Sequence, residues 1–100
     1  MPTQLGIKFG GIRAARLEAS PRLQAVLRVL VRGGWWSARE IRIATGDIVE
    51  AVPTAVQELK ANGVQIEPSR YLLGKHCWRL VPDFDVDGFL KERGIGGERD

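Results

Sequence analysis

The sequence predicts an α+β domain in which a core of three short helices is followed by a β-hairpin and one more short helix. Three observations support this fold class. Apolar residues recur at helical spacing in three successive segments, and residues that start and stop helices bound each one. Two runs that favour strands follow, with a glycine between them. The chain has 100 residues, the size of one domain, and contains no internal repeat.

The first helix is expected to begin at Ser20 and Pro21 and to end near Arg32. Serine can cap the free backbone N–H groups of a helix, and proline suits the first helical position. Gly33 and Gly34 then stop the helix. Its apolar residues fall on one face, which predicts a buried stripe: Leu23, Val26, Leu27 and Leu30.

A second helix is expected to open at Ser37 and to close at Thr45 and Gly46. Ser37 and Glu40 have the spacing of a capping box, in which each residue satisfies a backbone N–H of the other. Arg39 and Arg42 should point outward. The residues that can face inward are Ala38, Ile41 and Ala44.

The third helix is expected to run from about Val52 to Asn62, with Pro53 in its first turn and Gly63 after its end. Its apolar residues share one face: Val52, Ala55, Val56 and Leu59. The opposite face carries Glu50, Thr54, Gln57 and Ala61.

Residues 64–67 and 77–81 are the two expected strands, and the segment from Pro68 to His76 is the polar, basic tip between them. Asp85 suits the cap of a last short helix, with Phe84 packed onto Phe89. Three tryptophans are expected to pack in the core or at its edge rather than to stack on bases: Trp35, Trp36 and Trp78.

Charge and composition divide the chain into three parts. Residues 1–19 are interpreted as a loosely ordered basic arm, residues 20–81 as the folded domain, and residues 82–100 as a short helix with an acidic tail. Lys and Arg outnumber acids six to one in residues 1–32, whereas acids outnumber them six to three in residues 83–100. This asymmetry favours a polyanionic partner for the main body.

Other functional classes find little support in the residues. No run approaches the about 20 apolar residues that cross a bilayer, and no signal peptide is evident. His76 and Cys77 cannot fill a four-ligand zinc site, and no internal disulfide can form from one cysteine. The aspartates of residues 83–88 match the start of a calcium-binding loop, but Gly94 stands where its glutamate belongs. We therefore expect no metal, no cofactor, no catalytic residue and no enzyme activity.

The order of elements from residue 20 to residue 81 resembles small winged helix-turn-helix proteins encoded by bacteriophages and prophages. The segments that carry this resemblance are Ser20–Gln24, Ser37–Ile41, Thr45–Gly46, Ala55–Gly63 and Val64–Ile66. The resemblance implies duplex DNA binding, in transcription regulation or in the excision of phage DNA, within the cytoplasm of a bacterial host. The hairpin, or wing, departs from the family pattern because it contains Leu72 and Leu73 and is less basic.

In this interpretation the helix of residues 52–62 enters the major groove, which is about 12 Å wide. Base contacts are expected from Thr54, Gln57 and Ala61, because glutamine can pair bidentately with adenine and alanine permits close approach. Contacts to the DNA backbone are expected from Ser37, Arg39, Arg42, Lys60, Arg70, Tyr71, Lys75 and His76.

A second hypothesis is that the same fold serves as a protein-interaction module, such as an anti-CRISPR-like inhibitor of a host nuclease or defence complex. The acids near the third helix, the two wing leucines and the acidic tail favour this alternative: Asp47, Glu50, Glu58, Leu72 and Leu73. A homodimer is compatible with either hypothesis, and the sequence does not choose its interface.

Overall fold

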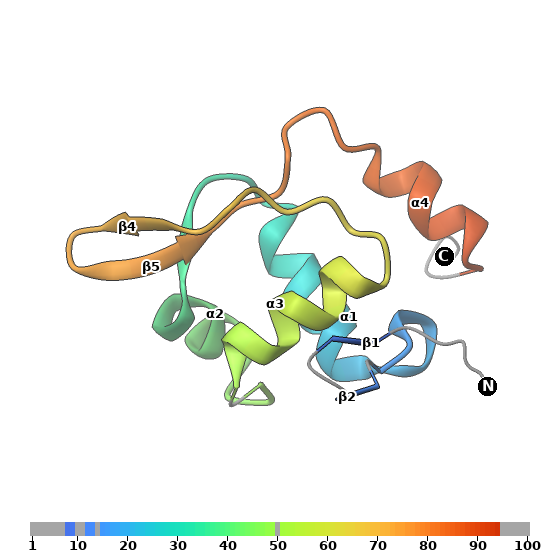
Figure 1. Cartoon of the computed structure of the whole chain (residues 1–100), viewed down its shortest axis with the longest axis horizontal. Helices are drawn as coiled ribbons and strands as arrows, with labels where there is room; N and C mark the ends of the chain where they lie inside the picture. The colour runs from blue at the N-terminus through green and yellow to red at the C-terminus, as the bar shows by residue number, and fades with distance from the viewer. Residues whose placement is uncertain (1–7, 10–11, 14, 50, 95–100) are drawn as a thin grey trace.

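The computed structural model describes residues 8–9, 12–13, 15–49 and 51–94, and it is an α+β structure (Figure 1). Its α-helices in this part of the chain are α1 (Pro21–Leu30), α2 (Ala38–Ala44), α3 (Val52–Ala61) and α4 (Val86–Glu92). Strands β3 (Trp36–Ser37), β4 (Arg70–Leu72) and β5 (Lys75–Trp78) form an antiparallel sheet in the order β3-β5-β4. A separate antiparallel pair joins β1 (Lys8–Phe9) to β2 (Ile12–Arg13), and the 3-10 helix η2 spans Leu17–Ala19.

Local capping residues set three of the four helix starts. The Ser20 hydroxyl accepts the Leu23 N–H at 3.2 Å, and Asp85 accepts the Gly88 N–H at 3.0 Å. Ser37 and Glu40 form the predicted capping box, with reciprocal bonds of 3.2 and 2.9 Å. In α3 the missing N–H of Pro53 falls in the first turn, where it has no intrahelical partner to lose.

The core lies where α1, α2 and α3 meet. Its fully buried side chains include Leu23, Val26, Leu30, Ile41, Val52, Val56 and Leu59. Each such side chain contributes about 1.5–3 kcal/mol relative to its exposed state. The predicted inner faces of α1 and α3 are therefore confirmed. In α2 only Ile41 is buried, and Ala44 is exposed because this short helix runs past the edge of the core.

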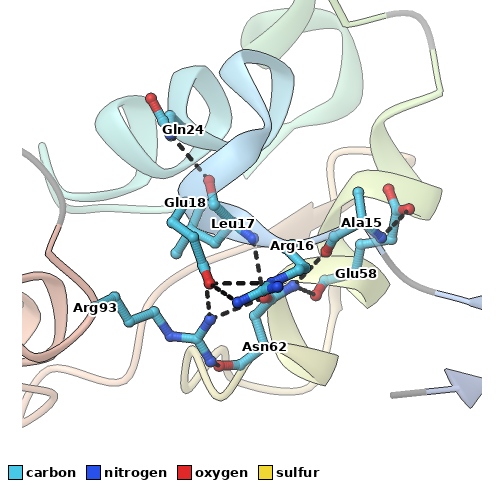
Figure 2. Close-up of polar contacts among 8 residues, drawn as sticks. All are labelled: Ala15, Arg16, Leu17, Glu18, Gln24, Glu58, Asn62 and Arg93. Atoms are coloured by element: carbon cyan, nitrogen blue, oxygen red, sulfur yellow. Dashed lines mark hydrogen bonds and ion pairs between the residues drawn. The ribbon is translucent and has the colours of Figure 1, made fainter. Parts of the chain in front are cut away.

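The sequence predicted a loosely ordered arm over residues 1–19. Among the residues described there, those that follow the β1–β2 pair differ from this prediction. Leu17 is completely buried in the core. Its N–H donates to Oδ1 of Asn62 at 3.0 Å, and Nδ2 of Asn62 donates to the Ala15 carbonyl at 2.8 Å (Figure 2). Asn62 lies at the end of α3, so this segment is fastened to the third helix.

The hairpin extends further toward its tip than the predicted strands, which pair only in part. Val64 and Ile66 alternate inward as expected, but Ile66 makes only a single bridge with Leu80. The continuous ladder lies beyond Pro68, which has no N–H to donate, and pairs residues 70–72 with 75–77. The turn at its tip is Leu73-Gly74, whose φ angles are +51° and +78°.

The last helix packs back on the domain through its aromatic side chain. The rings of Phe84 and Phe89 lie 5.4 Å apart, as the sequence predicted. Phe89 also lies against Gly63, which has a φ of +103° and where an added Cβ would be 3.3 Å from the ring. Among the described residues, none of the helices has the length and apolar character needed to cross a membrane.

Candidate nucleic-acid interface

Helix α3 has one fully buried side and one exposed side. Val52, Val56 and Leu59 anchor it to the core with no exposed surface. On the opposite side Thr54 and Gln57 are exposed, while Lys60 and Ala61 are half-buried. The predicted exposure of Thr54 and Gln57 is confirmed, and these two side chains lie on adjacent turns of the same face.

The acidic residue within α3 does not belong to this exposed face. Glu58 is 6% exposed, and Oε1 of its carboxylate lies 2.7 Å from Nη2 of Arg22. Its other oxygen accepts the Ala15 N–H at 3.1 Å. The charge that argued against phosphate contact is therefore turned inward and neutralised. Glu50, the other acid placed on this face, lies outside the described residues.

Helix α2 presents Arg39 in its first turn and Arg42 in its last turn, while its N-cap hydroxyl is buried. Arg39 and Arg42 are exposed, and Arg42 lies 3.9 Å from the exposed Asp47. Ser37 is 3% exposed and its hydroxyl accepts the Glu40 N–H. Because the Glu40 carboxylate also occupies this helix end, an incoming phosphate would meet a negative charge there. Ser37 is thus a buried capping residue, and its contact with a DNA backbone stays a prediction that its burial and the Glu40 charge do not favour.

The β4–β5 hairpin carries the remaining predicted backbone contacts. Arg70, Lys75, Tyr71 and His76 are all exposed. Tyr71 and His76 are cross-strand partners whose rings meet edge to face at 4.8 Å, so they form one aromatic pair on one face of the hairpin.

Trp35 joins the base of this hairpin to the body of the domain. The guanidinium carbons of Arg70 and Arg79 each lie 4.8 Å from the centroid of its ring. Arg79 is held in turn by Glu67 at 2.8 Å. Trp35 is half-buried and Trp78 is 6% exposed, while Trp36 donates its indole N–H to the Gly33 carbonyl at 2.9 Å. The tryptophans are thus packing residues, as predicted, and the Trp35 cluster was not foreseen.

Exposed charges are unevenly distributed over the described part of the molecule. In Figure 1 the hairpin projects on one side of α3 and α4 lies on the other side. The exposed acids Asp83, Asp85, Asp87 and Glu92 lie in α4 and the segment before it. The exposed cations of α2 and the hairpin are Arg39, Arg42, Arg70 and Lys75, but Glu40 in α2 and Asp47 just after it are exposed acids. The charges of the α2 segment therefore balance, and only the β4–β5 hairpin presents cations without acids.

A cleft of about 560 Å³ lies away from the exposed face of α3, between α1 and the α4 region. Leu27, Val31 and Phe84 contribute its apolar lining, and Arg28 and Asp87 contribute charges. Among the described residues, no cluster of three or more His, Cys, Asp or Glu side chains is placed to hold a metal ion.

Comparisons with protein-family models, with curated proteins and with solved structures yield no match for this chain.

Proposed function

We propose that this chain is a winged helix-turn-helix protein that binds duplex DNA, with α3 as its recognition helix and the β4–β5 hairpin as its wing. The order α1, β3, α2, α3, β4, β5 and the three-stranded sheet β3-β5-β4 support this assignment. Such a protein of phage type would serve as a transcriptional regulator or as an excision or architectural factor.

The single observation that carries the proposal is the position of Thr54 and Gln57. Both are exposed on a helix whose opposite side is completely buried, so the helix is a rigid support for two polar side chains. A major groove admits one helix, and a glutamine can pair with the N6 and N7 atoms of adenine. Ala61 on the same face lacks bulk and permits close approach.

Phosphate contacts come from the cations around this face. Arg39 and Arg42 lie in α2, Lys60 lies in the last turn of α3, and Arg70 and Lys75 extend along the wing with Tyr71 and His76. Such contacts set the register of the protein on the duplex, whereas α3 sets the sequence preference.

The test is binding of the purified chain to a random pool of short duplexes, followed by selection and by titration at several salt concentrations. The logarithm of affinity should fall with the logarithm of salt with a slope of about −4.5, because about five cations neutralise phosphates at about 0.9 each. Arg39→Ala should reduce this slope by about 1. The matched control is Arg28→Ala, an exposed arginine of α1, which should leave it unchanged. Absence of any duplex binding at low salt would refute the proposal.

The alternative is the protein-interaction module, inhibiting a host nuclease or defence complex. The cleft between α1 and the α4 region favours it, because an apolar lining with acidic side chains at its edge suits a protein partner. In this case Val31→Asp should abolish inhibition of the purified host complex, and Gln57→Ala should not. The reverse pattern would reject this alternative.

A further inference from the structure

We propose that the tip of the β4–β5 hairpin enters the minor groove and that Leu73 acts there as an apolar wedge against a base step, which bends the DNA. This inference rests on the proposed function, since it assigns a role to a wing residue in the same complex. It concerns a residue for which the fold itself provides no use.

Leu73 is fully exposed, with 100% of its surface accessible. Its exposure exceeds that of the other exposed large apolar side chains in the described residues, the next being Ile43 and Tyr71 at 65%. Leucine gains stability by burial, so a leucine at this position contributes nothing to the folded chain through packing.

The backbone at Leu73 is equally unfavourable for leucine. Its φ of +51° lies in the left-handed region, where a Cβ atom is crowded by the backbone. Gly74 follows at +78°, so both central residues of this two-residue turn have positive φ. Hairpins with this geometry favour Asn-Gly, which avoids the strain and exposes an amide rather than an apolar chain. Strained backbone that the surrounding structure holds in place, here the β4–β5 ladder, clusters at functional sites.

The surroundings of Leu73 indicate which partner would cover it. Lys75 pairs across the ladder with Leu72, next to the tip, whereas the guanidinium of Arg70, at the other end of β4, lies over Trp35 at the base of the hairpin. An apolar tip beside an exposed cation matches a minor groove, where phosphates line both edges and the floor consists of base edges. Apolar side chains that wedge between base steps from the minor groove are an established way of bending DNA.

The hairpin has the length and the support that this role requires. Leu73 lies seven positions beyond Ile66 of the Ile66–Leu80 bridge, which corresponds to about 23 Å of extended chain. That reach is enough to pass from a major groove about 12 Å wide across one backbone to the neighbouring minor groove. The contacts of Arg70 and Arg79 with Trp35 fix the base of the hairpin, so the tip is held in one direction.

The decisive variant is Leu73→Asn, which suits the turn and removes the wedge. The probe is the duplex selected by the wild-type protein. A circular-permutation assay measures how far the protein bends it. In a second experiment 2-aminopurine is placed at successive pyrimidine–purine steps, which unstack most easily, and its fluorescence reports unstacking. The wild type should bend the duplex and raise the fluorescence at one step. Leu73→Asn should abolish both effects and weaken binding about tenfold. Leu73→Met, which keeps an apolar side chain, should retain the bend.

Val31→Asn is the matched control, because it removes another exposed apolar side chain, which follows α1. This variant should bend DNA like the wild type. If Leu73→Asn binds and bends the duplex like the wild type, while Gln57→Ala still alters sequence preference, the wedge is refuted and the proposed function stands. If the wild type binds no duplex at all, both are refuted. A third outcome is that the wild type binds anionic phospholipid vesicles, that Leu73→Asn does not, and that both bend DNA equally. This result would refute the wedge and assign the tip to a lipid surface.

Discussion

Nη2 of Arg22 lies 2.7 Å from Oε1 of Glu58, and this ion pair joins α1 to the inner side of α3. The Glu58 side chain is 8% exposed and that of Arg22 is 34% exposed, so the pair is shielded on the acidic side. This ion pair also determines the charge on the opposite, exposed side of α3. Because Glu58 is directed inward, the only charged residue among those described on the exposed face of α3 is Lys60.

Arg22→Ala is expected to lower the free energy of unfolding by about 2 kcal/mol, because it leaves the Glu58 carboxylate buried without its cation. Urea denaturation measures the change. Arg28→Ala, on the exposed side of the same helix, should stay within about 0.5 kcal/mol of the wild type. Equal effects of the two substitutions would contradict the role assigned to the pair.

Gln57→Ala is expected to change which sequence the protein prefers. Loss of a bidentate contact to adenine removes about 1–3 kcal/mol of discrimination at one base pair and leaves the other positions unchanged. Competition binding with single-base variants of the selected duplex measures this. Lys60→Ala, on the same face, should instead weaken binding to all duplexes alike, since a phosphate contact carries no sequence information. A uniform loss for Gln57→Ala would mean that it does not contact a base.

Trp35→Leu is expected to loosen the hairpin from the domain. Two contacts with guanidinium groups at 4.8 Å are lost, each worth about 0.5–1 kcal/mol at an exposed site. The unfolding free energy should fall by the sum of these, about 1–2 kcal/mol, and amide hydrogen exchange should accelerate in β4 and β5. Trp35→Phe keeps an aromatic ring and should retain part of the stability and most of the protection. Unchanged exchange in Trp35→Leu would show that the ladder alone orients the hairpin.

The sequence was informative wherever structure depends on neighbours along the chain. Ser20, Ser37 and Asp85 each cap a helix within three residues of themselves, so their roles could be predicted from spacing. The alternation of Val64 and Ile66 predicted a strand, and residues 65–67 do pair with residues 79–81, although through a single bridge. The continuous ladder beyond Pro68 was not predicted.

Long-range contacts could not be predicted in the same way. Asn62 and Gly63 look like an ordinary helix stop, but the Asn62 amide also binds Ala15 and Leu17, which are more than 40 residues away. Likewise, no local pattern brings Arg70 and Arg79 to Trp35. At the interface, spacing predicted the exposure of Thr54 and Gln57, while the inward turn of Glu58 depended on a partner in another helix.

Glu18 gives the stability of the fold an expected dependence on pH. Hydrogen bonding by its own backbone N–H, followed by the side chains of Arg16 and Arg93, lowers the pKa of the Glu18 carboxyl below its ordinary value of 4.5, against an opposing effect of burial. A carboxyl whose pKa is lowered on folding stabilises the fold above the unfolded value, and this contribution is lost as the pH falls through the folded value.

The thermal midpoint should therefore decline below about pH 4.5, and Glu18→Gln should make that decline shallower. Glu92→Gln provides the control, because Glu92 is an exposed acid of α4. Identical slopes for Glu18→Gln and the wild type would contradict the assignment.

Asn62→Asp is expected to be among the most destabilising conservative substitutions in this chain. Asn62 is 2% exposed, and its Nδ2 donates to the carbonyls of Ala15 and Glu58 at 2.8 Å each (Figure 2). Its Oδ1 accepts the Leu17 N–H at 3.0 Å and Nη1 of Arg93 at 3.1 Å, and Arg93 also donates to the Asn62 carbonyl. An aspartate replaces the donor by an oxygen that faces two carbonyl oxygens.

The loss should be about 3 kcal/mol, because the Ala15 carbonyl loses the Asn62 donor, the Glu58 carbonyl keeps only the Asn62 backbone N–H, and the new charge is compensated only by Arg93. Urea denaturation at neutral pH measures it, and Gln65→Glu, the same amide-to-acid change at an exposed site, should cost little. At a pH low enough to protonate the introduced carboxylate, its O–H can again donate to one of the two carbonyls. The difference from the wild type should then narrow, whereas a loss caused only by altered shape would not change with pH.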